Sequence, residues 1–168
     1  MEKSGFFNSV NGDRLYDASD FARYFGALAS NGVFYHSADN LKVLPGGTGV
    51  SVIVSPGSGW INGYSYENDA EMSFQLSTPN GVTPRIDRIV LRLDMTLRRI
   101  FLAVKAGVAQ ANPEPPALTR TADVYELALA DVFVSHAAVA IVVADITDRR
   151  LDQSLCGLVN SLVSAVYE

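Results

Sequence analysis

The sequence is poor in the residues on which disulfide bonding and nucleophilic catalysis depend. It contains one cysteine, Cys156, and two histidines, His36 and His136. A lone cysteine cannot form an internal disulfide, and in the apolar run SLCGLVNSLV it is expected to be a small buried side chain. Neither histidine lies in a recognisable motif, so few pairings of a nucleophile with a general base are open to this chain. We therefore expect no catalytic residue and no cofactor, and predict that the protein is not an enzyme.

Long apolar runs and an excess of basic residues are missing as well. No segment approaches the ~18 apolar residues of a membrane span, and the N-terminus MEKSGFFNSVNGD lacks the apolar core of a secretory signal. Lysine and arginine number 13 against 18 aspartates and glutamates, which gives a net charge of −5. This balance offers no broad positive surface to nucleic acid or to an anionic membrane. We expect a protein made in the cytoplasm that binds neither.

Motifs for phosphate and metal ions are incomplete. The glycine-rich turn PGGTGVS at residues 45–51 lacks the lysine of a phosphate-binding loop and precedes no helical pattern. Four aspartates later in the chain match no calcium-loop spacing, and we expect them to be solvated carboxylates beside Arg149 and Arg150 rather than a metal site. They are Asp131, Asp145, Asp148 and Asp152.

The chain does contain enough apolar residues, 48% of 168, for one main domain with a sizeable core. Residues 1–40 predict a helical segment packed on that domain. Ser19 and Asp20 can cap a helix through FARYFGALA that ends near Asn31-Gly32. Helical spacing places an aromatic face on this helix, formed by Phe21, Tyr24, Phe25 and Leu28.

Residues 41–150 predict a β-rich domain. VSVIVS, GWINGYSYE and EMSFQLS are typical of short strands between glycine and proline turns, and RIDRIVLRLDMTLRRIFLAVKAG predicts a long hairpin turning at residues 95–98. AQANPEPPALTRT is expected to be a loop, and YELALADVFV and AIVVADI to be strands. The arginines of the hairpin alternate with Asp87 and Asp94, which predicts cross-strand ion pairs. The fold class is mainly β (α+β), an antiparallel β-sandwich or partly open barrel with a helix at each end.

Residues 151–168 predict a C-terminal amphipathic helix. Its leucines repeat with spacings of four, three and four, at Leu151, Leu155, Leu158 and Leu162. Such a seam either joins copies of the chain across a symmetry axis or packs on the sheet of its own subunit, and the sequence favours neither.

One segment has the composition of a glycan-binding surface. Trp60, Tyr64 and Tyr66 lie next to Glu67 and Glu71. Aromatic rings stack on sugars, although alternating aromatics in a short strand are more often core and cross-strand pairs. This leaves two alternatives to a structural role: a carbohydrate-binding module that uses the three rings with Glu67, and a cell-wall glycan hydrolase that uses Glu67 or Glu71.

Several segments together resemble a structural module of siphophages and prophages of Gram-positive bacteria. They are GFFNSVNGDRLYDASDFARYFGALASNGVF, GWINGYSYEN, RIDRIVLRLD, YELALADVFV and ITDRRLDQSLCGLV, in this order, and they span nearly the whole chain. The module is similar to the N-terminal part of baseplate and receptor-binding tail (fibre) proteins. The resemblance implies a virion structural protein that supports host attachment and ends up in the virion tail.

The implied partners are other tail or baseplate proteins and further copies of the chain, with a trimer favoured. A host cell-surface polysaccharide is a partner only if the module itself carries the recognition surface. We expect Phe6, Phe7, Phe21 and Phe25 to anchor the N-terminal segment on a neighbour and the C-terminal leucines to mediate self-association.

Overall fold

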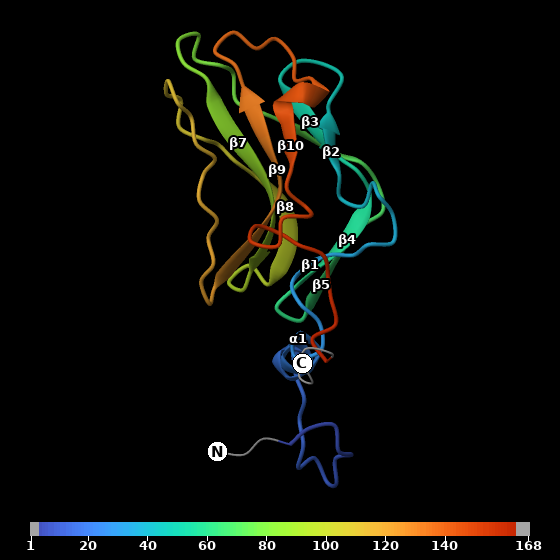
Figure 1. The fold of residues 1–168 in the computed structure, drawn as a ribbon. Helices are drawn as coiled ribbons and strands as arrows, with labels where there is room; N and C mark the ends of the chain where they lie inside the picture. Colours follow the sequence, from blue (N-terminus) through green and yellow to red (C-terminus); the bar gives the residue numbers. More distant parts are fainter. Residues whose placement is uncertain (1–3, 164–168) are drawn as a thin grey trace.

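The computed structural model describes residues 4–163, which form a mainly β, sandwich-like molecule with one helical element projecting from it (Figure 1). Residues 4–17 have no regular structure, and α1 follows at Ala18–Gly26. Its N-cap is Asp17, whose side chain accepts from the Ser19 and Asp20 backbone N–H groups. Asp20 in turn accepts from the Asp17 N–H group and completes a capping box. The helix is thus confirmed, but it begins and ends earlier than the sequence predicts.

Three antiparallel sheets form the body of the molecule. Two are small: β1 (Gly32–Val33), β4 (Gly57–Ile61) and β5 (Tyr64–Asn68) form one, and β2 (Val43–Pro45), β3 (Ser51–Val54) and β6 (Met72–Gln75) form the other. The largest has the order β10-β9-β7-β8, with β7 at Arg85–Asp94, β8 at Arg99–Lys105, β9 at Val124–Val134 and β10 at Ile146–Asp148. The predicted hairpin is β7 and β8, and the predicted strand YELALADVFV is β9. AIVVADI is a strand only from Ile146, because Val143–Asp145 forms a 3-10 turn, η1.

The apolar core lies between the largest sheet and the two smaller ones. Leu91 of β7 and Leu127 of β9 face Val52 of β3 and Ile61 of β4, all at most 1% exposed. Each such side chain contributes about 1.5–3 kcal/mol by leaving water. At Gly59 the β4 backbone approaches β7 so closely that a Cβ atom would lie 2.7 Å from the Leu91 side chain. A side chain at this position would therefore displace the end of the buried Leu91 side chain.

The opposite face of the largest sheet carries charges instead of a second apolar layer. Arg88 lies opposite Asp131 and Arg92 opposite Glu126 across β7 and β9, while Lys105 of β8 lies opposite Arg88. Asp131 and Glu126 are only 4% and 0% exposed. We call these five side chains the charged face.

The proline-rich segment between β8 and β9, residues 106–123, covers the charged face (Figure 1). The Pro116 carbonyl accepts from Arg88 at 2.9 Å and the Ala117 carbonyl accepts from Lys105 at 2.7 Å. The Thr119 N–H donates to Glu126 at 2.6 Å. This loop was predicted, but its role as the cover of a buried ionic layer was not.

The predicted C-terminal helix is wrong for residues 151–163, which form turns and isolated bridges; the rest of it, 164–168, lies outside the described residues. Tertiary hydrogen bonds replace the helical ones. The Leu155 carbonyl accepts from the Ala128 N–H and from Arg120, and the Gly157 carbonyl accepts from the Val33 N–H. Gly157 itself has φ +82°, which lies outside a right-handed helix. Leu158 packs on the core of its own subunit.

No helix among residues 4–163 is long and apolar enough to cross a membrane.

Candidate assembly surface

The most prominent apolar surface is the projecting N-terminal element. Of the nine residues of α1 only Ala22 is buried. We call this element, residues 4–28, the aromatic stem, because five of its aromatic side chains are 43–58% exposed: Phe6, Phe7, Phe21, Tyr24 and Phe25. Four of them are the residues expected to anchor this segment on a neighbour; Tyr24 belongs to the predicted aromatic helix face.

Four of the five exposed rings of the stem contact one another. The Phe6 ring centroid lies 5.6 Å from that of Phe21 and 4.9 Å from that of Tyr24, and Tyr24 lies 5.7 Å from Phe25. Phe25 then meets Trp60 of β4 edge-on at 6.0 Å. Aromatic pairs at these separations add about 0.5–1.5 kcal/mol each beyond area burial. The stem is therefore an ordered surface.

Tyr16 holds residues 4–17 against the helix, and the sequence pattern gave no sign of it because it lies before the periodic residues. Its ring stacks on Phe6 at 5.8 Å. Its hydroxyl accepts from the Phe7 N–H at 2.9 Å and donates to the Phe7 carbonyl at 3.2 Å. The exposed Phe7 side chain, with Arg14 over its ring, is thereby fixed in place.

The stem joins the body through a narrow contact. Ala22 and Gly26 pack on the turn between β4 and β5, where Gly63 has φ +84° and a Cβ atom would lie 1.9 Å from the Ala22 carbonyl oxygen. Asn31 and Asn62 reinforce this turn with two hydrogen bonds of 2.9 and 2.7 Å. Only glycine permits this approach of helix and turn.

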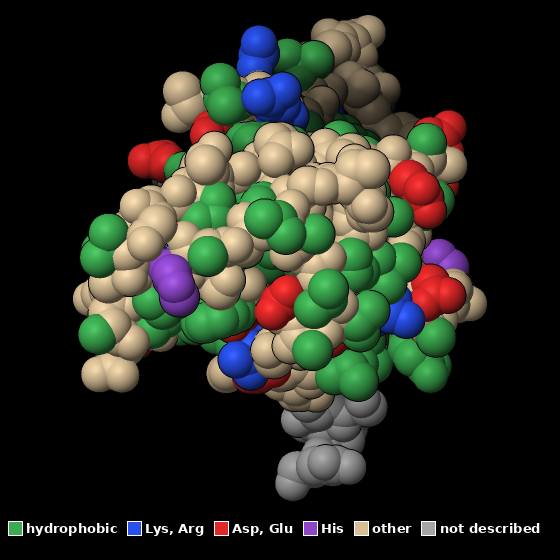
Figure 2. Space-filling view, turned by 90° about the horizontal axis from the view of Figure 1, so that it is seen from above, with side chains coloured by type: hydrophobic (Ala, Val, Ile, Leu, Met, Phe, Trp, Pro, Cys, Tyr) green, Lys and Arg blue, Asp and Glu red, His purple; other side chains and the backbone are tan. Residues whose placement is uncertain are grey.

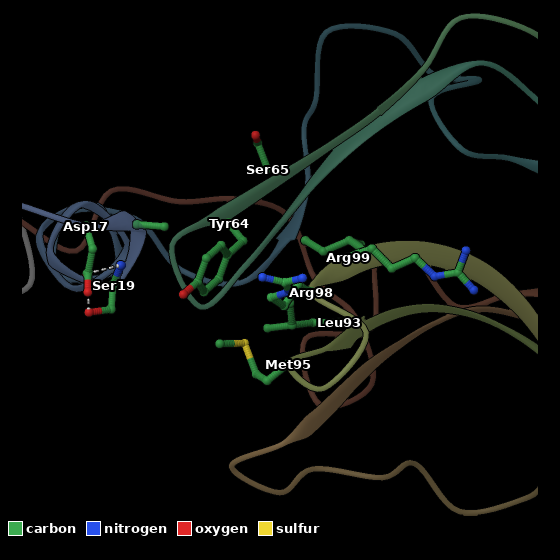
Figure 3. Close-up of a pocket in the computed structure, with 10 residues that line it drawn as sticks. Asp17, Ser19, Tyr64, Ser65, Leu93, Met95, Arg98 and Arg99 are labelled. Atoms are coloured by element: carbon green, nitrogen blue, oxygen red, sulfur yellow. Dashed lines mark hydrogen bonds between the residues drawn. The ribbon is translucent and has the colours of Figure 1, made fainter.

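A cavity of about 680 Å³ opens between the start of α1 and the turn of the β7–β8 hairpin (Figure 3). Tyr64, Leu93, Met95 and Ile100 give it a largely apolar lining. Asp17 and Ser19 lie on the helix side of the cavity, and Arg98 on the hairpin side. Hydrogen bonds from the Ser19 side chain and backbone lower the pKa of Asp17, so its carboxylate is committed to the helix cap.

Two guanidinium groups border this cavity. Within residues 4–163, neither Arg98 nor Arg99 takes part in an ion pair. Arg99 instead lies over the Phe101 ring at 4.4 Å. The cross-strand ion pairs of the hairpin arginines form with β9 rather than within the hairpin: Arg88 pairs with Asp131 and Arg92 with Glu126. Arg85 pairs with Asp87, which the sequence had indicated as a partner, but on its own strand. Asp94 accepts from the Leu97 N–H in the hairpin turn.

The four candidate glycan-contact residues do not share one face. Trp60 lies opposite Ser65, and Ser58 opposite Glu67, on one side of the β4–β5 pair. Tyr64 and Tyr66 lie on the other side, against the core. Burial raises the pKa of Tyr66. Trp60 contacts Phe25 and Phe34, and its buried indole Nε1 has no hydrogen-bond partner among the described residues. The three rings thus form no common platform.

The acidic residues considered for metal binding are dispersed. Asp131 is buried between Arg88 at 2.6 Å and Arg149 at 2.8 Å, and Asp148 pairs with Arg150 at 2.6 Å. The expectation of solvated carboxylates is therefore wrong for Asp131, because register places it opposite Arg88 under the proline-rich cover. No group of three or more potential ligands is arranged for a metal ion within residues 4–163.

The four C-terminal leucines do not line up on one surface. Leu151 is 69% and Leu162 37% exposed, Leu155 is half-buried, and Leu158 contacts the core. The Leu162 N–H donates to the Leu28 carbonyl at 2.9 Å, which places this segment beside the stem. Residues 151–163 form no helix, so these leucines do not form the helical seam through which self-association was predicted.

No protein-family model, no curated protein and no solved structure matches this chain.

Proposed function

We propose that this chain is a non-enzymatic structural component of a phage-type tail, a baseplate or fibre-base adaptor that supports host recognition. The observation that carries the proposal is the aromatic stem. Monomeric proteins rarely leave contiguous apolar surface of this kind in water, and such surfaces are typical of sites where proteins associate.

The chemistry of the body supports an assembly role. The two acidic side chains of the charged face, Glu126 and Asp131, are neutralised by arginine and lysine, so neither is available as a general acid or base. The sheets supply a rigid body, while the stem projects from one end of it (Figure 1). The resemblance of the sequence to baseplate and fibre-base modules supports a tail as the assembly.

The far end of the body presents a different surface. Seen from the end opposite the stem, hydrophobic side chains are interleaved with polar and charged ones (Figure 2). Among the large apolar side chains of the loop between β9 and η1, Val139 is the most exposed, at 86%. This mixture contrasts with the contiguous rings of the stem and makes the stem the principal contact in the proposed assembly.

Immunogold labelling tests the proposal. Antibodies against the purified chain are applied to particles sedimented from an induced culture that carries the gene, with a culture deleted for the gene as the control. We expect gold at the tail tip of intact particles and none in the control. Particles with unlabelled tails, with the chain left in the supernatant, would contradict a tail location.

A further inference from the structure

We propose that the aromatic stem is the surface through which identical copies of this chain associate, so that the neighbour on the stem is a second copy of the same stem. This inference rests on the proposed function, in which the chain is a repeated part of a symmetric assembly. It replaces the C-terminal leucines as the self-association element.

The exposed apolar area matches what association needs. Aromatic side chains bury about 150–250 Å² each, so five rings that are 43–58% exposed leave roughly 500 Å² in water. Val10 and Leu15, 67% and 91% exposed on the same element, add roughly 100 Å² each. The total of roughly 700 Å² is close to the ~800 Å² per partner of a standard interface.

The helix also needs a partner for its own stability. Isolated helices shorter than about 12–15 residues are marginal in water, and α1 has nine. Its ring and backbone contacts with the body are made by Ala22 and Gly26, which pack on the β4–β5 turn, and by Phe25, whose ring meets Trp60. A neighbour that covers the exposed parts of Phe21, Tyr24 and Phe25 adds packing that the body of its own subunit does not supply.

The charges of the stem are suited to contact with an identical surface. Identical copies bring identical charges together, and a chain with a net charge of −5 repels itself unless the contact region is nearly neutral. Residues 4–28 carry three acidic and two basic side chains. Arg23 pairs with Asp20 at 3.1 Å and Arg14 lies 3.9 Å from Asp13, so only Asp17 is left, and it caps the helix.

The C-terminal part of the described chain also runs to the end of the molecule that carries the stem. The Ser30 N–H donates to the Asn160 carbonyl at 2.9 Å, so residues 159–163 run beside the base of the stem. Copies that meet through their stems therefore gather both ends of the described chain around one axis. Their charged faces and covering loops remain outside the contact.

Light scattering on the purified full chain over a graded concentration series tests the proposal. We expect a mass at least twice the 18.1 kDa of one chain for the natural sequence. The double variant Phe7→Ser/Phe21→Ser is expected to raise the dissociation constant at least about 100-fold, since truncating an interface aromatic costs about tenfold or more. The matched control Val139→Ser/Leu151→Ser removes two apolar side chains that are 86% and 69% exposed elsewhere, and its mass should stay that of the natural chain.

A second readout locates the contact. Cys156 is 4% exposed and burial raises its pKa to about 12, so a cysteine introduced at the exposed Ala27 is the single reactive thiol. Ala27→Cys labelled with pyrene should show excimer emission that the Phe7→Ser/Phe21→Ser changes abolish, whereas labelled Val139→Cys should show none. Far-UV circular dichroism confirms that each variant keeps the fold.

Each outcome decides separately for the two proposals. A natural chain that is monomeric at every concentration, or a stem variant that keeps the full mass, overturns self-association through the stem. If tails are labelled by antibody while the purified chain stays monomeric, this inference fails and the tail location stands. If the stem mediates association but no tail is labelled, the reverse holds.

Discussion

Neutralising Glu126 tests whether the charged face stabilises the fold. One carboxylate oxygen accepts from Arg92 Nε at 2.8 Å, and the other accepts from Lys105 Nζ and from the Thr119 N–H, both at 2.6 Å. In Glu126→Gln one amide oxygen replaces two acceptors, and the new NH₂ group faces donors. Breaking a buried ion pair costs about 3–5 kcal/mol. Because Arg92 and Lys105 are 30% and 18% exposed and keep some water, we expect the lower value, about 3 kcal/mol.

Urea unfolding followed by the fluorescence of Trp60, the single tryptophan, measures this loss. With an m-value of about 2 kcal/mol/M, the midpoint should fall by about 1.5 M. The matched control is Asp39→Asn in the exposed pair with Lys42, which should change stability by less than about 1 kcal/mol. A loss at Glu126 no larger than that of the control would refute the view that the covered charges behave as buried ones.

Three further perturbations follow from contacts described above. Burial raises the pKa of Glu126, but hydrogen bonds from Lys105, Thr119 and Arg92 outweigh this effect and hold the pKa below the ordinary 4.5. The free energy of unfolding should therefore be constant above pH 4.5 and fall as the pH drops further. Urea midpoints that do not decline between pH 5 and about pH 3 would contradict this. Gly63→Ala places a Cβ atom against Ala22 in a left-handed backbone and should lower the free energy of unfolding by at least about 1–2 kcal/mol. The measurements are a lower urea midpoint and a shifted Trp60 emission. An unchanged spectrum would argue against the contact. With a pKa of about 12, buried Cys156 should react with a thiol reagent at pH 8 only after urea unfolding, and rapid labelling of the native chain would show it accessible.

Local sequence patterns were enough to predict the elements whose apolar residues alternate, form a continuous run or recur at helical spacing. The hairpin of β7 and β8 follows from the alternation around Ile89 and Leu91, and β9 from its β-branched and aromatic second half. The N-terminal helix followed from spacing and capping chemistry, although Asp17 proved the better cap, because Asp20 could then complete the capping box. In each case the pattern that reveals the element lies within the element itself, even where its partner strand, as for β9 on β7, lies far away in the sequence.

Long-range contacts explain where sequence patterns fell short. The leucine spacing after Leu151 suggested a helix, yet Arg120 and Ala128 take up backbone carbonyls of that segment, and no local pattern reveals this competition. The pairing of Arg88 with Asp131 depends on strand register across 43 residues. The division of Trp60 from Tyr64 and Tyr66 follows from register as well. Trp60 lies opposite Ser65 and shares its face, and the neighbouring Tyr64 and Tyr66 point to the other face of β5.

The loop over the charged face has a kinetic consequence. It contributes backbone carbonyls and an amide as partners for Arg88, Lys105 and Glu126, so it cannot lift away without breaking one hydrogen bond to each of these groups. The local opening of this loop is therefore coupled to the opening of the strands beneath it. In hydrogen–deuterium exchange the Thr119 amide should accordingly behave as part of the β-sheet, exchanging only in the cooperative opening that releases β9, although it belongs to no strand.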